Sequence, residues 1–84
     1  MSRTPLSAAD RERGKRVVMT LRARREAARR TAAELSESAQ VPLDTVRALE
    51  SGRVVTPSFL TVAALGRALD LSLDELVAVA WEDG

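Results

Sequence analysis

The sequence contains no cysteine and no histidine, and its aromatic residues are a single Phe and a single Trp. Without cysteine the chain has no disulfide and no catalytic thiol, and without either residue type it lacks the usual zinc ligands and imidazole acid–base chemistry. The carboxylates fall in helix-start signals and on exposed faces, with no convergent partner. We therefore expect no metal, no cofactor and no enzymatic activity.

Long apolar segments are absent as well. No run approaches the roughly 20 residues that a membrane-spanning helix needs, and the opening residues, MSRTPLSAADRERG, lack the apolar segment of a signal peptide. We therefore expect no membrane partner and a cytoplasmic location. The apolar content of 45% comes almost entirely from Ala, Leu and Val, which favours a single folded domain rich in helices.

The net charge of +1 conceals an uneven distribution along the chain. Residues 1–30 hold ten basic and three acidic side chains, residues 31–53 hold two and four, and residues 54–84 hold one and five. A basic first third favours a polyanionic partner near the amino-terminal half, because charge distribution governs association. The alternative is an arginine-rich helix face that is simply solvated.

Start and stop signals divide the chain into five predicted helices. Ser7 can cap a first helix to about residue 28, although Gly14 interrupts it. We therefore predict a basic, frayed N-terminal arm over residues 1–14 and a domain over residues 15–84. Thr31-Ala-Ala-Glu34 is a capping box that opens a second helix over 32–39.

The remaining three helices have comparable signals. Pro42 opens a third helix that runs to Ser51, and Gly52 supplies its left-handed stop. Thr56-Pro57 predicts a fourth helix to about residue 69, and Ser72-Leu-Asp-Glu75 is a capping box for a fifth to about residue 81. The predicted buried side of the fourth helix is Phe59, Val62, Leu65 and Leu69, and the apolar stripe of the fifth is Leu73, Leu76, Val77, Ala80 and Trp81.

Two short helices joined by a tight turn, the second with an exposed start, are typical of the helix-turn-helix arrangement. The run TAAELSESAQVPLDTVRALESGR, followed by TPSFLTVAALGRALDLSLDEL, resembles the phage-repressor (Cro/CI-type, xenobiotic-response-element) helix-turn-helix family over roughly residues 17–76. The resemblance implies an all-α, compact five-helix, lambda-repressor-like domain with a C-terminal helix. It also implies double-stranded DNA as the partner, and hence association with the nucleoid.

The resemblance implies a structural role for Arg25 and Glu50. The family places an arginine six residues before the cap of the second helix, and this arginine pairs with a glutamate near the end of the third. The two residues match here, so we expect an ion pair that ties the first helix to the third. The alternative for Arg25 is one more solvated arginine.

Position on the third helix implies which residues face the bases. Arg47 can make a bidentate contact to guanine, and Asp44 can accept from cytosine N4. Leu43 or Ala48 can lie against a thymine methyl group. Asp44 can instead stabilise the helix dipole, and Leu43 can anchor a protein. The predicted base-facing set is Pro42, Leu43, Asp44, Arg47 and Ala48.

Phosphate contacts are expected on either side of this surface. The amides at the start of the second helix favour an anion, although Ala32 replaces a glutamine that often clamps phosphate in the family. Ser51 and Arg53 match family positions that touch the DNA backbone. The predicted phosphate-contacting set is Thr31, Ala32, Thr45, Ser51 and Arg53.

Few residues of the third helix can contact DNA bases, so one copy would recognise few base pairs. This favours a homodimer that binds two half-sites on the DNA. The candidate interface is the stripe formed by Leu76, Val77, Ala80 and Trp81, because a large aromatic near the end of a small domain can anchor a partner. The alternative is that Trp81 folds back onto its own core. The segment Ser2 to Arg16 is either an arm on DNA or disordered.

These patterns predict a small DNA-binding transcriptional regulator that acts by promoter occupancy. Restriction-modification controllers and antitoxins include members of this size and family, and the sequence does not separate them from a plain repressor. The alternative, suggested by Leu43, Asp44 and Ala32, is a protein-interaction module, such as an antitoxin-like or regulator-partner protein, with the same fold and weak DNA readout.

Overall fold

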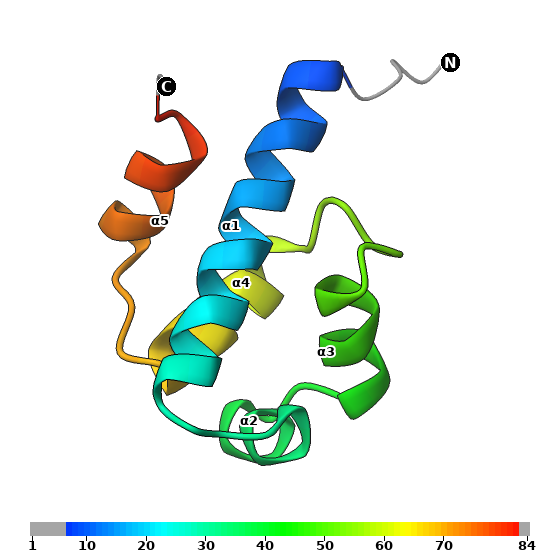
Figure 1. Ribbon diagram of the computed structural model, residues 1–84, viewed down its shortest axis with the longest axis vertical. Helices are drawn as coiled ribbons and strands as arrows, with labels where there is room; N and C mark the ends of the chain where they lie inside the picture. Colours follow the sequence, from blue (N-terminus) through cyan, green and yellow to red (C-terminus); the bar gives the residue numbers. More distant parts are fainter. Residues whose placement is uncertain (1–6, 83–84) are drawn as a thin grey trace.

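The computed structural model describes residues 7–82, which form five α-helices and no β-strand. The helices are α1 (Ala8–Ala27), α2 (Ala32–Ala39), α3 (Leu43–Glu50), α4 (Phe59–Ala68) and α5 (Leu73–Ala80). The all-α, five-helix fold expected from the sequence is therefore confirmed. Figure 1 shows α5 and α3 on opposite sides of α1, with α2 crossing the lower end and α4 behind.

One hydrophobic core joins all five helices. α1 packs against α5 and α3, while α2 packs against α3 and α4. Each helix contributes one or two large side chains at helical spacing, so the amphipathic faces meet at the centre. The buried apolar residues are Val18, Leu21, Leu35, Val41, Val46, Leu49, Leu65, Leu69, Leu71, Leu76 and Ala80.

The first helix has the start that the sequence predicted, because Ser7 caps it, and it continues without interruption through Gly14. Gly14 lies against the backbone carbonyl of Val55, and a Cβ at this position would overlap that oxygen. The glycine therefore allows α1 to approach the loop before α4. Fraying of the helix ahead of Gly14 stays a prediction. The prediction of an arm over residues 1–14 falls in part on residues 1–6, outside the described residues.

The other helix starts follow the sequence with two exceptions. α4 begins two residues later than predicted, because Ser58, and not Thr56, accepts the amide hydrogen bond of Thr61. At α5 the hydroxyl of Ser72 accepts from the Glu75 amide, but the glutamate makes no return bond to the cap. That carboxylate lies instead 4.0 Å from a guanidinium nitrogen on α1.

Phe59 is not in the core, contrary to the predicted stripe of α4. The stripe is buried at Leu65 and Leu69, partly buried at Val62, and 66% exposed at Phe59. Phe59 is the first residue of the helix, where the packing against the rest of the core ends. It forms an exposed apolar pair with Leu60.

Candidate nucleic-acid interface

The turn between α2 and α3 fixes the relative position of these two helices. Gln40 adopts a left-handed conformation that ends α2, and Val41 then enters the core. The hydroxyl of Ser36 donates to the carbonyl of Val41 across the turn. Because the turn is anchored by burial and by hydrogen bonds, α3 is held with its start projecting from the molecule.

Arg25 and Glu50 form the ion pair that the family resemblance implied. The guanidinium donates to both carboxylate oxygens, with distances of 2.7 Å from Nε and 2.9 Å from Nη2. The two side chains are only 13% and 16% exposed. This bidentate hydrogen bond to Glu50 raises the pKa of Arg25. The pair ties α1 to the last turn of α3 and sets the orientation of the helix.

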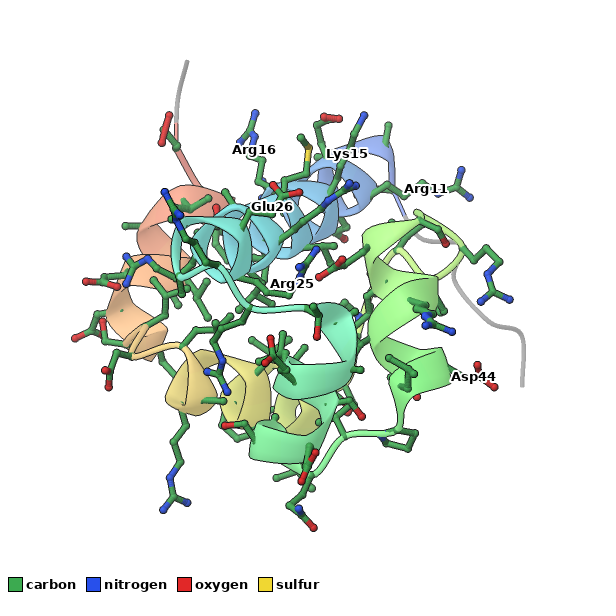
Figure 2. The ribbon with its side chains drawn as sticks, turned by 60° about the horizontal axis from the view of Figure 1, so that its bottom comes forward. Arg11, Lys15, Arg16, Arg25, Glu26 and Asp44 are labelled. Atoms are coloured by element: carbon green, nitrogen blue, oxygen red, sulfur yellow. The ribbon has the colours of Figure 1, made fainter. Side chains whose placement is uncertain are left out.

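The outer face of α3 presents the residues expected to face DNA bases. Val46 and Leu49 point into the core, which turns Pro42, Asp44 and Arg47 toward solvent. Figure 2 shows Asp44 extending away from the body of the molecule. The other two members of the base-facing set are only partly exposed; these are Leu43 and Ala48.

The start of α2 differs from a simple phosphate cradle. The amide of Thr31 already donates to the Glu34 carboxylate at 2.8 Å, and the Thr31 hydroxyl accepts from the Glu34 amide at 3.0 Å. Hydrogen bonding of the Glu34 carboxylate to Thr31, chiefly to its backbone amide, lowers the pKa of Glu34. The amide of Thr31 is therefore engaged, and the free helix-start amides are those of Ala32 and Ala33.

The end of α3 and the following loop carry the remaining phosphate-contact candidates. Gly52 has a φ of +86° and stops the helix as predicted. Ser51 donates its hydroxyl to the carbonyl of Ala48, whereas the guanidinium of Arg53 is exposed and makes no hydrogen bond within residues 7–82. Thr45 is partly exposed on α3. Among these three candidates, Arg53 is the one whose polar group is available.

Residues 12–79 match a protein family described as a helix-turn-helix domain. The chain belongs to this helix-turn-helix family. The match spans all of α2 to α4 and most of α1 and α5, so it covers the geometry described above. In domains of this kind the second of the two helices is presented to the major groove of DNA. A comparison with curated proteins gave no match.

Several arginines of the helix-turn-helix domain have a role that the sequence did not reveal. Arg16 donates to the carbonyls of Ala80 and Glu82, which end α5, and Arg30 donates to the carbonyl of Ala68, which ends α4. The last carbonyls of a helix have no partner within it and carry partial negative charge. These arginines therefore cap other helices, which explains part of the basic first third.

Further arginines of α1 are engaged in ion pairs. Arg13 bonds to Asp10 at 2.7 Å, Arg22 lies 3.4 Å from Glu26, and Arg24 reaches Glu75 at 4.0 Å. The first two pairs join residues three or four apart on one helix, a spacing that can be seen in the sequence. The pair between Arg24 and Glu75 depends on the packing of α1 against α5, so the sequence alone could not predict it.

The candidate dimer stripe divides into two parts. Leu76 and Ala80 are buried in the core of their own helix-turn-helix domain, so they are unavailable to a second copy, and that part of the expectation was wrong. Val77 is 57% and Trp81 60% exposed. Trp81 does not fold back into the core; its ring lies 4.9 Å from the guanidinium of Arg13.

None of the helices within residues 7–82 has the length and apolar character that a bilayer span requires. The same residues contain no group of three or more potential metal ligands.

Proposed function

We propose that this chain is a transcriptional regulator that binds double-stranded DNA through α3 and acts by occupying a promoter. The observation that carries the proposal is the presentation of Pro42, Asp44 and Arg47 on the outer face of α3, with the helix fixed to α1 through the Arg25–Glu50 pair. A rigidly positioned helix with an exposed start is what major-groove recognition requires. Such a regulator works in the cytoplasm, on nucleoid DNA.

Direct readout in this proposal depends mainly on Arg47. Its guanidinium is exposed and has no partner within the described residues, so it can make the bidentate contact to guanine O6 and N7. Asp44 lies one turn earlier and can accept from cytosine N4. Leu43 and Ala48 are partly exposed, which leaves them enough surface to contact a thymine methyl group.

Phosphate binding is proposed at Arg53 and at the amides of Ala32 and Ala33. The loop arginine is exposed and unpaired within residues 7–82, and free amides at a helix start favour an anion. Because many arginines of α1 cap helices or form ion pairs, we propose fewer phosphate contacts than the basic first third alone suggests. The salt dependence of binding should be correspondingly modest.

The regulator is proposed to bind as a homodimer. A single short helix with one arginine reads few base pairs, and two copies would read two half-sites about one helical turn apart. The exposed side of α5, formed by Leu73, Val77 and Trp81, is the proposed interface. These residues recur at i, i+4 and i+8, so they line one face of the helix.

The test is selection of bound duplexes from a randomised pool, followed by fluorescence anisotropy at about 50 to 200 mM salt. We expect a two-fold symmetric motif in which Arg47→Ala relaxes one base position per half-site and costs about 1–3 kcal/mol. Arg53→Ala should weaken binding to all sequences and reduce the salt slope by about one.

Arg67→Ala is the matched control, because Arg67 is an exposed arginine on α4 without a partner within the described residues. It should leave both the motif and the salt slope unchanged. If wild-type protein selects no motif, or if Arg67→Ala weakens binding as much as Arg47→Ala, recognition through α3 is wrong.

The alternative of a protein-interaction module has less support. It is suggested by Leu43, Asp44 and Ala32, and the partial exposure of Leu43 leaves it less surface for a protein partner than a fully exposed anchor would have. The module hypothesis expects Leu43→Arg to abolish binding of a protein partner without weakening DNA binding. The regulator hypothesis expects Arg47 and Arg53 to be the sensitive positions.

A further inference from the structure

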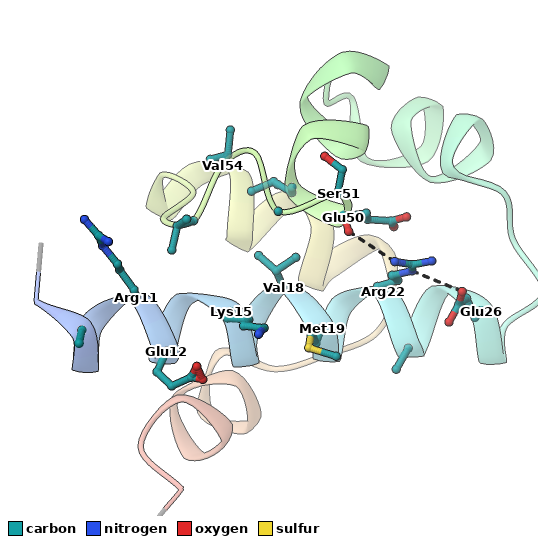
Figure 3. A pocket seen from close by; sticks show the side chains of 15 residues that line it. Arg11, Glu12, Lys15, Val18, Met19, Arg22, Glu26, Glu50, Ser51 and Val54 are labelled. Atoms are coloured by element: carbon teal, nitrogen blue, oxygen red, sulfur yellow. Dashed lines mark hydrogen bonds and ion pairs between the residues drawn. The ribbon is translucent and has the colours of Figure 1, made fainter.

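A groove of about 790 Å³ separates α1 from the segment that closes α3 and leads to α4. Figure 3 shows α1 along one side and the loop with Ser51 and Val54 along the other. The floor is the edge of the core, formed by Val18 and Leu49. The volume falls within the range of about 300–1,000 Å³ that is typical of small-molecule sites.

The middle of the groove is apolar and open to solvent. Met19 is 60% exposed and lines it from α1, together with Ala23, while Val54 lines the opposite wall and is also exposed. A flexible thioether adapts to ligands of different shape. Apolar side chains that remain exposed in a concave surface gain free energy when a ligand removes them from water.

The two ends of the groove differ in charge. At one end Arg11 and Lys15 are exposed, one turn apart on α1, and neither has a salt bridge within residues 7–82. At the other end Glu26 and Glu50 are neutralised by arginines. Glu12 also borders the first of these ends, three residues before Lys15, so that end holds two cationic side chains and one carboxylate (Figure 3).

We propose that this groove binds a small amphipathic carboxylate. The carboxylate would contact Arg11 and Lys15, which offer unpaired cationic donors, and the apolar chain would cover Met19 and Val54. From Lys15 to Ala23 the helix rises about 12 Å, which suits a medium-length alkyl chain. A cationic ligand is disfavoured at the basic end, and the end beside Glu26 offers no unpaired cationic group to a second carboxylate, because Arg22 is paired with Glu26.

The proposal does not rest on DNA binding, and its test contains no DNA. The full chain is titrated with octanoate while amide shifts are followed by NMR, with octanol and acetate as probes that lack the charge or the chain. We expect saturable shifts at the amides of Ala23, Ser51 and Val54, and at least about fivefold weaker binding of octanol and acetate.

Variants separate the groove from general surface binding. Met19→Glu should weaken octanoate binding about tenfold or more, equivalent to about 1.4 kcal/mol. Leu60→Glu introduces the same charge on α4, at an exposed residue outside the groove, and should bind octanoate as wild type does. A double variant, Arg11→Gln with Lys15→Gln, should weaken octanoate but leave octanol unchanged.

Three results would overturn the proposal. These are equal binding of octanoate and octanol, octanoate binding to Met19→Glu with wild-type affinity, and shifts that map away from the groove. Met19 is exposed, so its substitution should not disturb folding, and circular dichroism checks this. The double variant provides an independent test of the cationic end.

Discussion

Single arginines of α1, and Arg30 in the loop that follows it, act on elements far from them in the sequence. Arg16, Arg25 and Arg30 reach the ends of α5, α3 and α4 respectively, through carbonyls or through Glu50. A guanidinium carries several donors in a fixed plane, so one side chain can satisfy the unpaired groups of a helix end without bringing in a second polar residue. A lysine could not make the same contacts, because its ammonium group lacks this planar set of donors.

The Arg25–Glu50 pair gives the first stability prediction. We expect Arg25→Ala to lower the free energy of unfolding by about 3 kcal/mol, the lower end for a buried pair that loses one partner, because both groups keep some exposure. Urea denaturation measures the change.

Arg24→Ala is the control for that prediction, since Arg24 makes a longer and more exposed pair with Glu75. Its loss should cost no more than about 1 kcal/mol. Replacing both members of the first pair, with Arg25→Met and Glu50→Leu, should recover most of the lost stability. Equal costs for Arg25→Ala and Arg24→Ala would contradict the structural role of the buried pair.

Replacing Gly14 by alanine is expected to change stability in the opposite direction from the usual Gly→Ala substitution in a helix. In an ordinary helix interior, Gly→Ala stabilises by about 1 kcal/mol. Here the new Cβ would overlap the carbonyl oxygen of Val55, so we expect Gly14→Ala to destabilise by about 1–3 kcal/mol. Thermal unfolding decides the sign. Ala23→Gly, at an exposed position of the same helix, measures the difference in stability that helix propensity alone gives between alanine and glycine.

At the scale of the helices, starts are defined by side-chain caps and ends by backbone conformation. Ser7, Thr31, Ser58 and Ser72 each accept an amide hydrogen bond at a helix start. The ends of α1, α2 and α4 lead into the non-glycine left-handed residues Arg29, Gln40 and Asp70. Capping is local, so three of these starts were predicted from the sequence, whereas Ser58 was not. No local signal predicted the left-handed residues Arg29, Gln40 and Asp70.

The capping box of α2 predicts a dependence on pH. Hydrogen bonds from Thr31 lower the pKa of Glu34 below its ordinary value of roughly 4.3. The ionised carboxylate therefore stabilises the folded state at pH values above the ordinary pKa, and this contribution is lost as the pH falls through the lowered pKa.

We expect Glu34→Gln to melt at a lower temperature than wild type at pH 7, and the difference to shrink as the pH falls below the ordinary glutamate range. Thermal melts at a series of pH values measure this. A difference in melting temperature that is constant with pH would show that the charge of Glu34 is irrelevant to the cap.

At the scale of the whole molecule, exposed apolar side chains of residues 7–82 gather on two surfaces besides the groove. One is the outer side of α5, at Val77 and Trp81, and the other is the exposed pair Phe59 and Leu60 at the start of α4. Exposed large apolar residues in a group mark surfaces for association. The proposed dimer uses the first surface, since its residues line one face of a helix.

A pair of charge substitutions tests this choice. We expect Val77→Glu to convert the dimer to a monomer in sedimentation equilibrium, because an unpaired carboxylate at an apolar interface costs several kcal/mol. Phe59→Glu makes a similar change on the other surface and should leave the dimer intact. Dissociation by Phe59→Glu alone would move the interface to α4, and a monomeric wild type would exclude the dimer.

The parts of the molecule predicted from the sequence are those that depend on neighbours a few residues apart. The capping box at Thr31 and the glycine stop at Gly52 were placed correctly, because each depends on a local hydrogen bond or on one backbone angle. Phe59 was placed wrongly in the core, because helical periodicity indicates a face but not where along the helix the packing ends.

The sequence by itself determined five helices, the caps at Ser7, Thr31 and Ser72, and the pairing implied between Arg25 and Glu50. Only the tertiary structure decided that Gly14 admits the carbonyl of Val55, that arginines of α1 cap distant helices, and that Trp81 stays outside the core. The physical reason is range: propensity and capping act within a few residues, whereas these contacts join atoms about 40 to 70 residues apart, which only the packing of the helices brings together.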